Sequence, residues 1–263
     1  MTLSPSNVLD AITAERRRDV EEARRLVPEE ALRRAAEKRR HHSLIESLRS
    51  RPAPRIVAEV KKASPSAGVL IPEYDPAGIA RQYEAAGAAG ISVLTEPRHF
   101  LGSADHLCRV RAAVSLPILR KDFISDPYQV CEAAAWGADV VLLIVAALDR
   151  DLLARLHATA RELGLDAIVE VHTAEELSVA LECEGAIVGV NSRDLKTLRT
   201  DLAVAMSLAP LIPAGRVAIA ESGIKGREDI DRLEKAGYRG FLIGESLLRG
   251  GEPGEGLRRM RQD

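Results

Sequence analysis

The chain has 263 residues, of which 46% are hydrophobic and 29% charged, and its net charge is −2. This is the composition of an ordinary globular protein, and the small net charge gives no general attraction to nucleic acid or to a membrane surface. Aromatic residues make up only 3% of the chain, which argues against a platform for stacking nucleic-acid bases.

The sequence also predicts a cytoplasmic location. The N-terminus lacks the charged segment and apolar core of a secretory signal, and no apolar run is long enough to span a membrane. Three cysteines, an odd and sparse set, indicate a reducing compartment rather than a disulfide framework. We therefore expect neither nucleic acid nor a membrane as a partner.

Residues 1–50 are predicted to form a charged helical extension. A first helix can open at Pro5 and Ser6, Pro28 interrupts the pattern, and a second helix is predicted over residues 29–48. Basic runs at 16–18 and 38–40 suggest nucleic-acid contacts, but their acidic neighbours favour a solvated helix face. Each helix has one apolar stripe that must dock on another part of the protein.

From residue 55 onward, short apolar runs alternate with helical patterns. Eight strands are predicted over residues 55–60, 90–94, 117–120, 139–145, 167–171, 187–190, 217–221 and 240–243. Helices are predicted over residues 75–86, 104–114, 127–136, 151–163, 174–182, 201–208, 225–235 and 255–259. Several of these helices end at a glycine that fits a left-handed cap: Gly87, Gly137, Gly164 and Gly237.

This alternation is typical of βαβ units and a parallel sheet. Eight units in roughly 210 residues predict a (β/α)8 TIM barrel, with residues 1–50 as an N-terminal helical extension of one domain over 1–263. The alternative is an open doubly wound sheet. That fold would favour a G-x-G-x-x-G turn after an early strand, and the sequence has none.

Polar side chains follow the carboxyl ends of the predicted strands, where barrels of this class carry their chemistry. Glu59 and Lys61 share one face of the first strand, and alone they favour a structural salt bridge. The same alternation places further polar residues at the matching ends of later strands: Lys121, Glu170, Asn191 and Glu221. Six such residues on five strands predict a shared active site.

The turns after the last two strands predict a phosphate site. Ser222-Gly223 and Gly244-Glu245 follow these strands, and glycine lets backbone N–H groups approach an anion. Because the Glu245 carboxylate would repel phosphate, we expect its backbone N–H to make the contact. Glycine-rich turns that close a barrel without a ligand are the alternative.

Five motifs together resemble the indole-3-glycerol phosphate synthase family. They are EVKKASPS at 59–66, LRKDF at 119–123, VNSRDL at 190–195, ESGI at 221–224 and LIGES at 242–246. The resemblance covers essentially the whole chain, including the extension. One departure is Ala67, where many bacterial members carry lysine, and we expect it to affect loop dynamics more than activity.

The resemblance implies closure of an indole ring. The substrate would be 1-(o-carboxyphenylamino)-1-deoxyribulose 5-phosphate, and the products indole-3-glycerol phosphate, carbon dioxide and water. No redox step or electron sink is needed, so we expect no cofactor and no metal. The expected partner is this small phosphorylated molecule, and the expected state is a monomer, with a homodimer as the alternative.

The resemblance also implies roles for single residues. Lys121 would be the general acid of ring closure, Lys61 the anchor of the substrate carboxylate and a second acid, and Glu170 the base or proton partner in dehydration. How these three divide the proton transfers is open. Each lysine is expected to lower the pKa of the other. Supporting residues would orient the lysines, bind substrate hydroxyls or add positive charge: Glu59, Asn191, Glu221 and Arg193.

The other residues implied by the resemblance would bind the two ends of the substrate. Phe123 and Leu195 would form walls around the anthranilate ring. The phosphate-loop contacts would be Ser64, Ser222, Gly223, Gly244 and Glu245. One rival is the phosphoribosylanthranilate isomerase family, which has a similar fold but a Cys/Asp acid–base pair. The other is a catalytically silent barrel that acts as a scaffold or sensor.

Overall fold

The fold is built on a closed barrel of eight parallel strands. The computed structural model describes the chain except for residues 1–7, 38–39, 66, 195–198, 249–251 and 263. The barrel strands are β1 (Ile56–Val60), β4 (Gly90–Leu94), β5 (Ile118–Lys121), β6 (Val140–Ile144), β7 (Asp166–Val171), β8 (Ile187–Asn191), β9 (Ala218–Glu221) and β10 (Gly240–Ile243). They pair in chain order, and β10 pairs with β1 to close the barrel, which confirms the predicted fold class.

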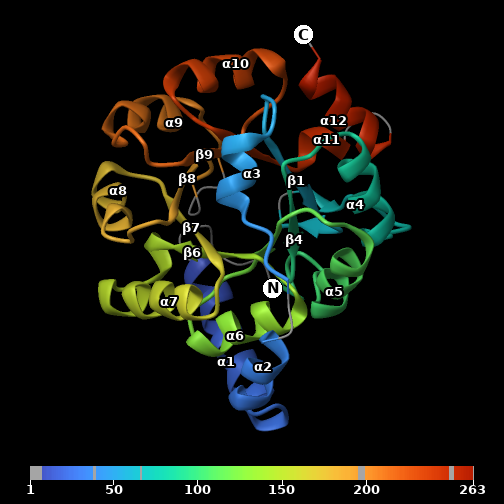
Figure 1. Ribbon diagram of the computed structural model, residues 1–263, viewed down its shortest axis with the longest axis vertical. Helices are drawn as coiled ribbons and strands as arrows, with labels where there is room; N and C mark the ends of the chain where they lie inside the picture. The colour runs from blue at the N-terminus through green and yellow to red at the C-terminus, as the bar shows by residue number, and fades with distance from the viewer. Residues whose placement is uncertain (1–7, 38–39, 66, 195–198, 249–251, 263) are drawn as a thin grey trace.

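Helices surround the barrel, as Figure 1 shows. They are α4 (Pro76–Ala85), α5 (Ala104–Ala113), α6 (Pro127–Trp136), α7 (Arg150–Glu162), α8 (Ala174–Leu181), α9 (Ala203–Leu208), α10 (Arg227–Ala236), α11 (Glu245–Leu248) and α12 (Pro253–Arg261). The four predicted cap glycines have positive φ, from 64° at Gly164 to 114° at Gly237, so the backbone turns there as only glycine does readily. None of the helices in the described part of the chain has the length and hydropathy needed to cross a membrane.

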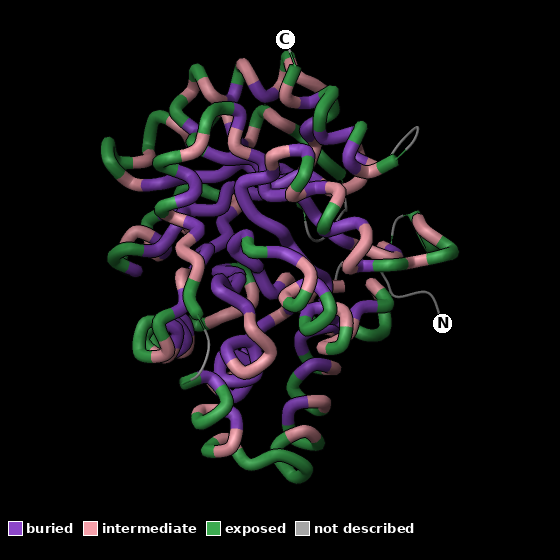
Figure 2. The backbone as a smooth tube through the Cα atoms, turned by 45° about the vertical axis from the view of Figure 1, so that its right-hand side comes forward, coloured by how far each residue is buried: buried purple, intermediate pink, exposed green. Residues whose placement is uncertain are grey.

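The centre of the molecule is buried, as Figure 2 shows, and alternation along the strands divides its side chains into two layers. Inward-facing residues such as Leu119, Ile168 and Ile219 fill the barrel, and outward-facing ones such as Ile118 and Val169 pack with the helices. Lys121, Glu170 and Glu221 each lie two residues beyond an inward-facing residue. The strand pattern therefore points them toward the barrel axis, as expected.

The extension consists of α1 (Val8–Leu26), α2 (Glu29–Ala36) and α3 (Leu44–Ser50). The prediction of one helix over residues 29–48 was wrong, because a separate helix begins at Leu44. Ser43 caps that helix, and the Asp166 carboxylate accepts hydrogen bonds from the backbone N–H groups of Leu44 and Ile45 at 2.7 and 3.2 Å. The acceptor that starts α3 thus comes from the first residue of β7.

The helices of the extension lie at opposite ends of the barrel. Leu44 and Leu48 of α3 join the apolar cluster inside the barrel, and α3 lies over the barrel centre in Figure 1. Leu44 and Leu48 close the mouth at the amino-terminal ends of the strands, because α3 is bound there by Asp166, the first residue of β7. Helix α1 instead reaches Asp122, directly after β5. The apolar stripes of the extension therefore dock at two places: α1 lies at the catalytic end, and α3 lies in the opposite mouth of the barrel.

Candidate active site

A cavity of about 610 Å³ lies at the carboxyl ends of the strands. The structure places in its lining all six residues that sequence analysis selected as catalytic: Glu59, Lys61, Lys121, Glu170, Asn191 and Glu221. The register of the sheet brings them level, since Asn191 of β8 pairs with Glu221 of β9. Polar groups that are far apart in the sequence thus converge on one rim.

Lys121 lies between two buried carboxylates. Its Nζ is 3.3 Å from Glu170 Oε2 and 3.7 Å from Glu221 Oε2. Burial disfavours the ammonium form, but the charge of Glu170 and, once it is ionised, that of Glu221 outweigh burial and raise the pKa of Lys121 above its usual value. The expectation that the pKa of Lys121 is lowered was wrong, because the carboxylates around the amine, Glu170, Glu221 and Glu59, raise it. Lys121 is therefore a fully protonated proton donor at neutral pH.

Glu170 is held ionised at the centre of the rim. Only 1% of its side chain is exposed, and Asn191 Nδ2 donates a 3.0 Å hydrogen bond to its Oε1. Burial opposes the charge, but Lys121 and the nearby His172 outweigh it and lower the pKa of Glu170. A carboxylate in this setting can accept a proton at neutral pH.

His172, which sequence analysis did not select, sits behind Glu170. Its Nε2 lies 3.6 Å from Glu170 Oε1, and its Nδ1 lies 3.2 Å from Glu176 Oε2. Burial disfavours the imidazolium, but Glu176 and Glu170 outweigh it and raise the pKa of His172. Its position one residue after the β7 strand was the signal that could have found it.

Glu221 differs from its neighbours because its neutral form is favoured. Burial, only partly offset by Lys121, combines with the negative charge of Glu170 to raise the pKa of Glu221 to about 8. Among the described residues its Oε1 has no hydrogen-bond partner. A side chain at Gly189 would collide with that oxygen, so the glycine inside β8 leaves room for Glu221. Gly189 was missed, although a glycine within a strand is a signal of such close approach.

Lys61 and Glu59 form a second ion pair on the rim, at 2.5 Å. Burial opposes ionisation of Glu59, but Lys61 and Lys121 outweigh it and lower the pKa of Glu59. A side chain at Gly244 would meet the Glu59 carboxylate, so this glycine makes room for the pair. Arg193 also lines the cavity, and its backbone N–H donates a 2.9 Å hydrogen bond to Asn191 Oδ1.

Two aromatic rings stand at one side of the cavity. The ring centroids of Phe123 and Phe100 are 6.2 Å apart, and both residues line the cavity. Phe100 lies on the loop after β4 and was not selected from the sequence, although phenylalanine is rare in this chain. Leu142 and Ile144 of β6 add an apolar surface. Leu195, the other predicted wall residue, lies outside the described residues.

The predicted phosphate turns form another part of the same lining. Ser222 and Gly223 have φ of 63° and 78°, and Gly244 directly precedes α11. Glu245 and several basic residues also line this part: Lys225, Arg227 and Arg259. Ser64 does not line the cavity. It belongs to the hairpin of β2 (Ala63–Ser64) and β3 (Gly68–Val69), where its hydroxyl accepts a 3.2 Å hydrogen bond from Ala67 N.

The rim carries neither a Cys/Asp acid–base pair nor a cluster of metal ligands among the described residues. Cys108 lies in α5, Cys131 in α6, and Cys183 follows α8, so these thiols are not at strand ends as a Cys/Asp pair would require. Within the described residues no group of three or more His, Cys, Asp or Glu side chains could hold a metal ion. The rim is thus a lysine–carboxylate site.

Comparisons of the sequence with known proteins agree on one family. Residues 9–260 match the family model described as indole-3-glycerol phosphate synthase. A relative of that name from Burkholderia vietnamiensis is 46% identical over 97% of this chain and 99% of its own length. One from Rhodospirillum rubrum is 52% identical over 78% of each chain. The solved thiamine phosphate pyrophosphorylase from Pyrococcus furiosus has a TM-score of 0.60 and 14% identity over 83% of this chain and 96% of its own, and it shows the fold alone.

Proposed function

The chain belongs to the indole-3-glycerol phosphate synthase family, and on that premise we propose how its rim residues carry out the reaction. The protein is a carboxy-lyase of tryptophan biosynthesis. It converts 1-(o-carboxyphenylamino)-1-deoxyribulose 5-phosphate to indole-3-glycerol phosphate, carbon dioxide and water. The roles of single residues are the proposal.

The proton balance of the reaction defines what the rim must supply. The ring carbon that bears the carboxylate attacks the ketone carbon, and the ketone oxygen takes a proton. Carbon dioxide then leaves, and its bonding electrons restore the aromatic ring. Loss of the new hydroxyl as water needs a second proton, and a base removes one from the adjacent CH₂. Each turnover therefore consumes one proton net, which balances the lost carboxylate charge.

Lys121 is the general acid of ring closure in this proposal. The observation that carries it is the position of its Nζ, 3.3 Å from Glu170 and 3.7 Å from Glu221, which keeps the amine charged and inside the cavity. After it donates, the neutral amine can be recharged by a neighbouring proton donor. Glu221, whose pKa is raised to about 8, supplies such a proton at neutral pH.

Glu170 is the base of dehydration, and Lys61 anchors the substrate carboxylate. A base must be ionised before it acts, and Lys121 and His172 favour that state in Glu170. Lys61 presents an ammonium at the same rim, with Glu59 as its counter-ion and guide. Asn191 orients Glu170 through its 3.0 Å hydrogen bond, and Arg193 adds positive charge near Glu59.

The two ends of the cavity suit the two ends of the substrate. We assign the anthranilate ring to the wall with Phe123 and Phe100, and Leu195 remains a predicted member of that wall. We assign the phosphate to the turns after β9 and β10, where glycine permits backbone approach and basic side chains add positive charge. The proposed contacts there are Ser222, Gly223, Gly244 and the backbone of Glu245. Ser64, the other residue implied by the resemblance, stays a prediction, since it does not line the cavity.

A direct test uses the fluorescence of the indole product. The wild type should form product, whereas Lys121→Ala and Glu170→Gln should each lose about 10²–10⁴ in kcat, the usual range for removal of an acid or base. Near-wild-type kcat in either variant would remove that residue from the proposed chemistry.

We further propose that residues 1–263 form a single domain, with residues 1–50 as its extension, working in the cytoplasm as a monomer. Support comes from α3 packing inside the barrel and from three free cysteines. The net charge of −2 favours a small-molecule substrate over nucleic acid. Light scattering of the purified protein tests the monomer, and a stable dimer would replace it with the homodimer alternative.

A further inference from the structure

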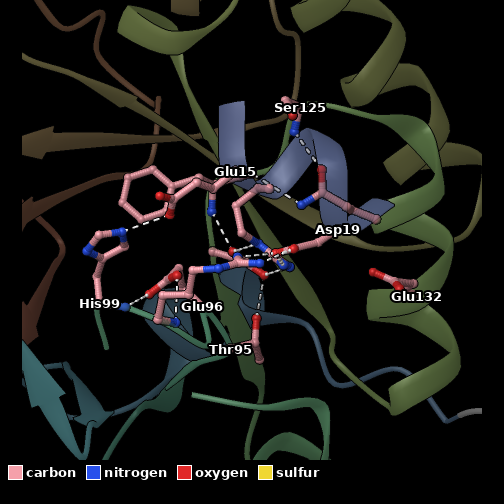
Figure 3. A network of polar contacts seen from close by, with 12 residues as sticks. Glu15, Asp19, Thr95, Glu96, His99, Ser125 and Glu132 are labelled. Carbon is pink, nitrogen blue, oxygen red and sulfur yellow. Dashed lines mark hydrogen bonds and ion pairs between the residues drawn. The ribbon is translucent and has the colours of Figure 1, made fainter. Parts of the chain in front are cut away.

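A cluster of buried charges joins helix α1 to the end of β5, behind the wall of the cavity (Figure 3). Arg16 donates to both carboxylate oxygens of Asp122, from Nε at 3.0 Å and from Nη2 at 2.8 Å. Only 8% of the Arg16 side chain and 0% of the Asp122 side chain are exposed. This bidentate contact is the geometry in which arginine holds a carboxylate most firmly.

Asp122 accepts three more hydrogen bonds around that contact. They come from Thr95 Oγ1 at 2.8 Å, Arg120 Nη2 at 3.0 Å and the backbone N–H of Phe123 at 2.9 Å. Burial opposes the charge, but Arg120 and Arg16 outweigh it and hold the pKa of Asp122 at about 2. The carboxylate is therefore a fixed anion that ties together α1, the end of β4 and the end of β5.

The neighbours of Asp122 in the sequence are both residues of the cavity. Lys121 precedes it and points to the barrel axis, and Phe123 follows it. Because successive side chains of a strand point to opposite faces, a carboxylate fixed on the outer face also fixes the backbone that carries Lys121. The hydrogen bond from Phe123 N to the same carboxylate sets the start of the next segment.

A second contact from α1 reaches the loop after β4. Asp19 accepts from Arg16 Nη1 at 2.6 Å and from Arg98 Nη1 and Nη2 at 2.7 and 2.5 Å. The loop is compact, because the Glu96 carboxylate accepts from the backbone N–H groups of Arg98, His99 and Phe100 at 2.9, 2.6 and 2.9 Å. Fixing Arg98 therefore fixes the backbone that presents Phe100.

The same face of α1 makes a further contact with this loop. Glu15 Oε2 lies 2.9 Å from His99 Nε2, and Figure 3 shows Glu15 and Asp19 facing the loop from one side of the helix. Three residues of α1 thus contact two segments, the loop after β4 and the segment after β5. The first segment carries Phe100, and the second carries Phe123. Within the cluster, the guanidinium groups of Arg16, Arg98 and Arg120 form ion pairs with Asp19, Asp122 and Glu132.

We propose that Arg16 and Asp19 are positioning residues that set the distance between Phe100 and Phe123, and thereby the fit of the anthranilate ring. Neither side chain lines the cavity itself. The inference rests on the proposed role of Phe123 as a wall of the ring site. It makes α1 a determinant of ring binding, in contrast to a brace that only adds stability.

The test compares Arg16→Met and Asp19→Asn with Arg24→Met. Arg24 is a control on the same helix: its side chain is 46% exposed and pairs with Asp126, the last residue before α6, and it contacts neither Asp122 nor Arg98. Misplacement of a substrate wall by about 1 Å can cost about a hundredfold in rate, so we expect Arg16→Met to lower kcat/KM by about 10- to 100-fold. Asp19→Asn should give a smaller loss, and Arg24→Met should behave as wild type.

Inhibition by two small probes separates positioning from stability. Anthranilate reports on the ring end and inorganic phosphate on the other end. Arg16→Met should weaken inhibition by anthranilate and leave inhibition by phosphate unchanged, and Arg16→Lys should restore part of the loss. Equal loss for both probes, or a lower melting temperature with unchanged kcat/KM, would overturn the inference and leave α1 as a brace.

Two further variants keep the outcome interpretable. If Arg16→Met does not fold, Arg16→Lys and Asp19→Asn carry the test, because each keeps a charge or hydrogen bond in the buried cluster. Phe123→Ala separates this inference from the proposed function. A normal KM in Phe123→Ala would refute the ring-wall role, whereas a raised KM there with wild-type behaviour of the α1 variants would refute only the positioning role.

Discussion

Replacing Lys121 by arginine or alanine separates its charge from its proton. Arginine keeps the positive charge between Glu170 and Glu221, but its pKa above ~12 makes it a poor acid. Alanine removes both. We therefore expect both variants to lose about 10²–10⁴ in kcat, equivalent to about 3–5 kcal/mol of transition-state stabilisation.

The distances at the rim predict how the two variants differ. At an effective dielectric constant of about 20, a unit charge 3.3 Å from another is worth about 5 kcal/mol. Lys121→Ala removes that attraction from the buried Glu170, so the pKa of Glu170 should rise. The acid limb of the pH–rate profile of the variant should therefore move to higher pH. Lys121→Arg keeps the charge, so its acid limb should stay near the wild-type position.

The assay is indole fluorescence, recorded as kcat and KM between about pH 5 and pH 9. Lys61 supplies the matched pair, because an anchor needs only charge and donors: Lys61→Arg should retain more kcat than Lys61→Ala. Substantial activity in Lys121→Arg would refute the assignment of Lys121 as the acid. A Lys61→Arg enzyme as inactive as Lys61→Ala would mean that Lys61 also moves a proton.

Three further predictions follow from the structure. Gly244→Val should raise KM by blocking backbone approach to phosphate and also lower kcat, because the new side chain meets Glu59; unchanged constants in a folded protein would remove Gly244 from the site. For Glu221→Gln, the melting temperature relative to that of the wild type should increase as pH rises from 5 to 8. A pKa raised from 4.5 to about 8 means that the stabilising contribution of Glu221 in the wild type is lost as pH rises through that window. A difference in melting temperature that does not change with pH would contradict this. Deleting residues 1–36 keeps α3 in the barrel mouth, so a folded protein with weakened substrate binding is expected, and unchanged KM with lower thermal stability would make the deleted part a brace.

The barrel was predictable because its information is local. Apolar runs, cap glycines such as Gly137 and the polar ends of strands can each be read within a few residues. Alternation within single strands also predicted which residues share the barrel interior, including Lys121 two positions after Leu119. The closed register then brings their ends to one rim.

Features that depend on distant contacts were not predictable. The break before α3 depends on Asp166, more than a hundred residues away along the chain, and a continuous apolar stripe conceals it. The pKa of Lys121 depends on carboxylates from other strands. Gly189 and Gly244 have meaning only once the Glu221 and Glu59 side chains are placed against them.

The most direct test of the account is a single turnover experiment on the purified wild type with 1-(o-carboxyphenylamino)-1-deoxyribulose 5-phosphate, with Lys121→Ala as its partner. Indole fluorescence and released carbon dioxide should rise together in the wild type, and both should slow by about 10²–10⁴ in the variant. A folded wild type that forms no indole, or a Lys121→Ala protein that forms it at the wild-type rate, would contradict the proposed rim chemistry.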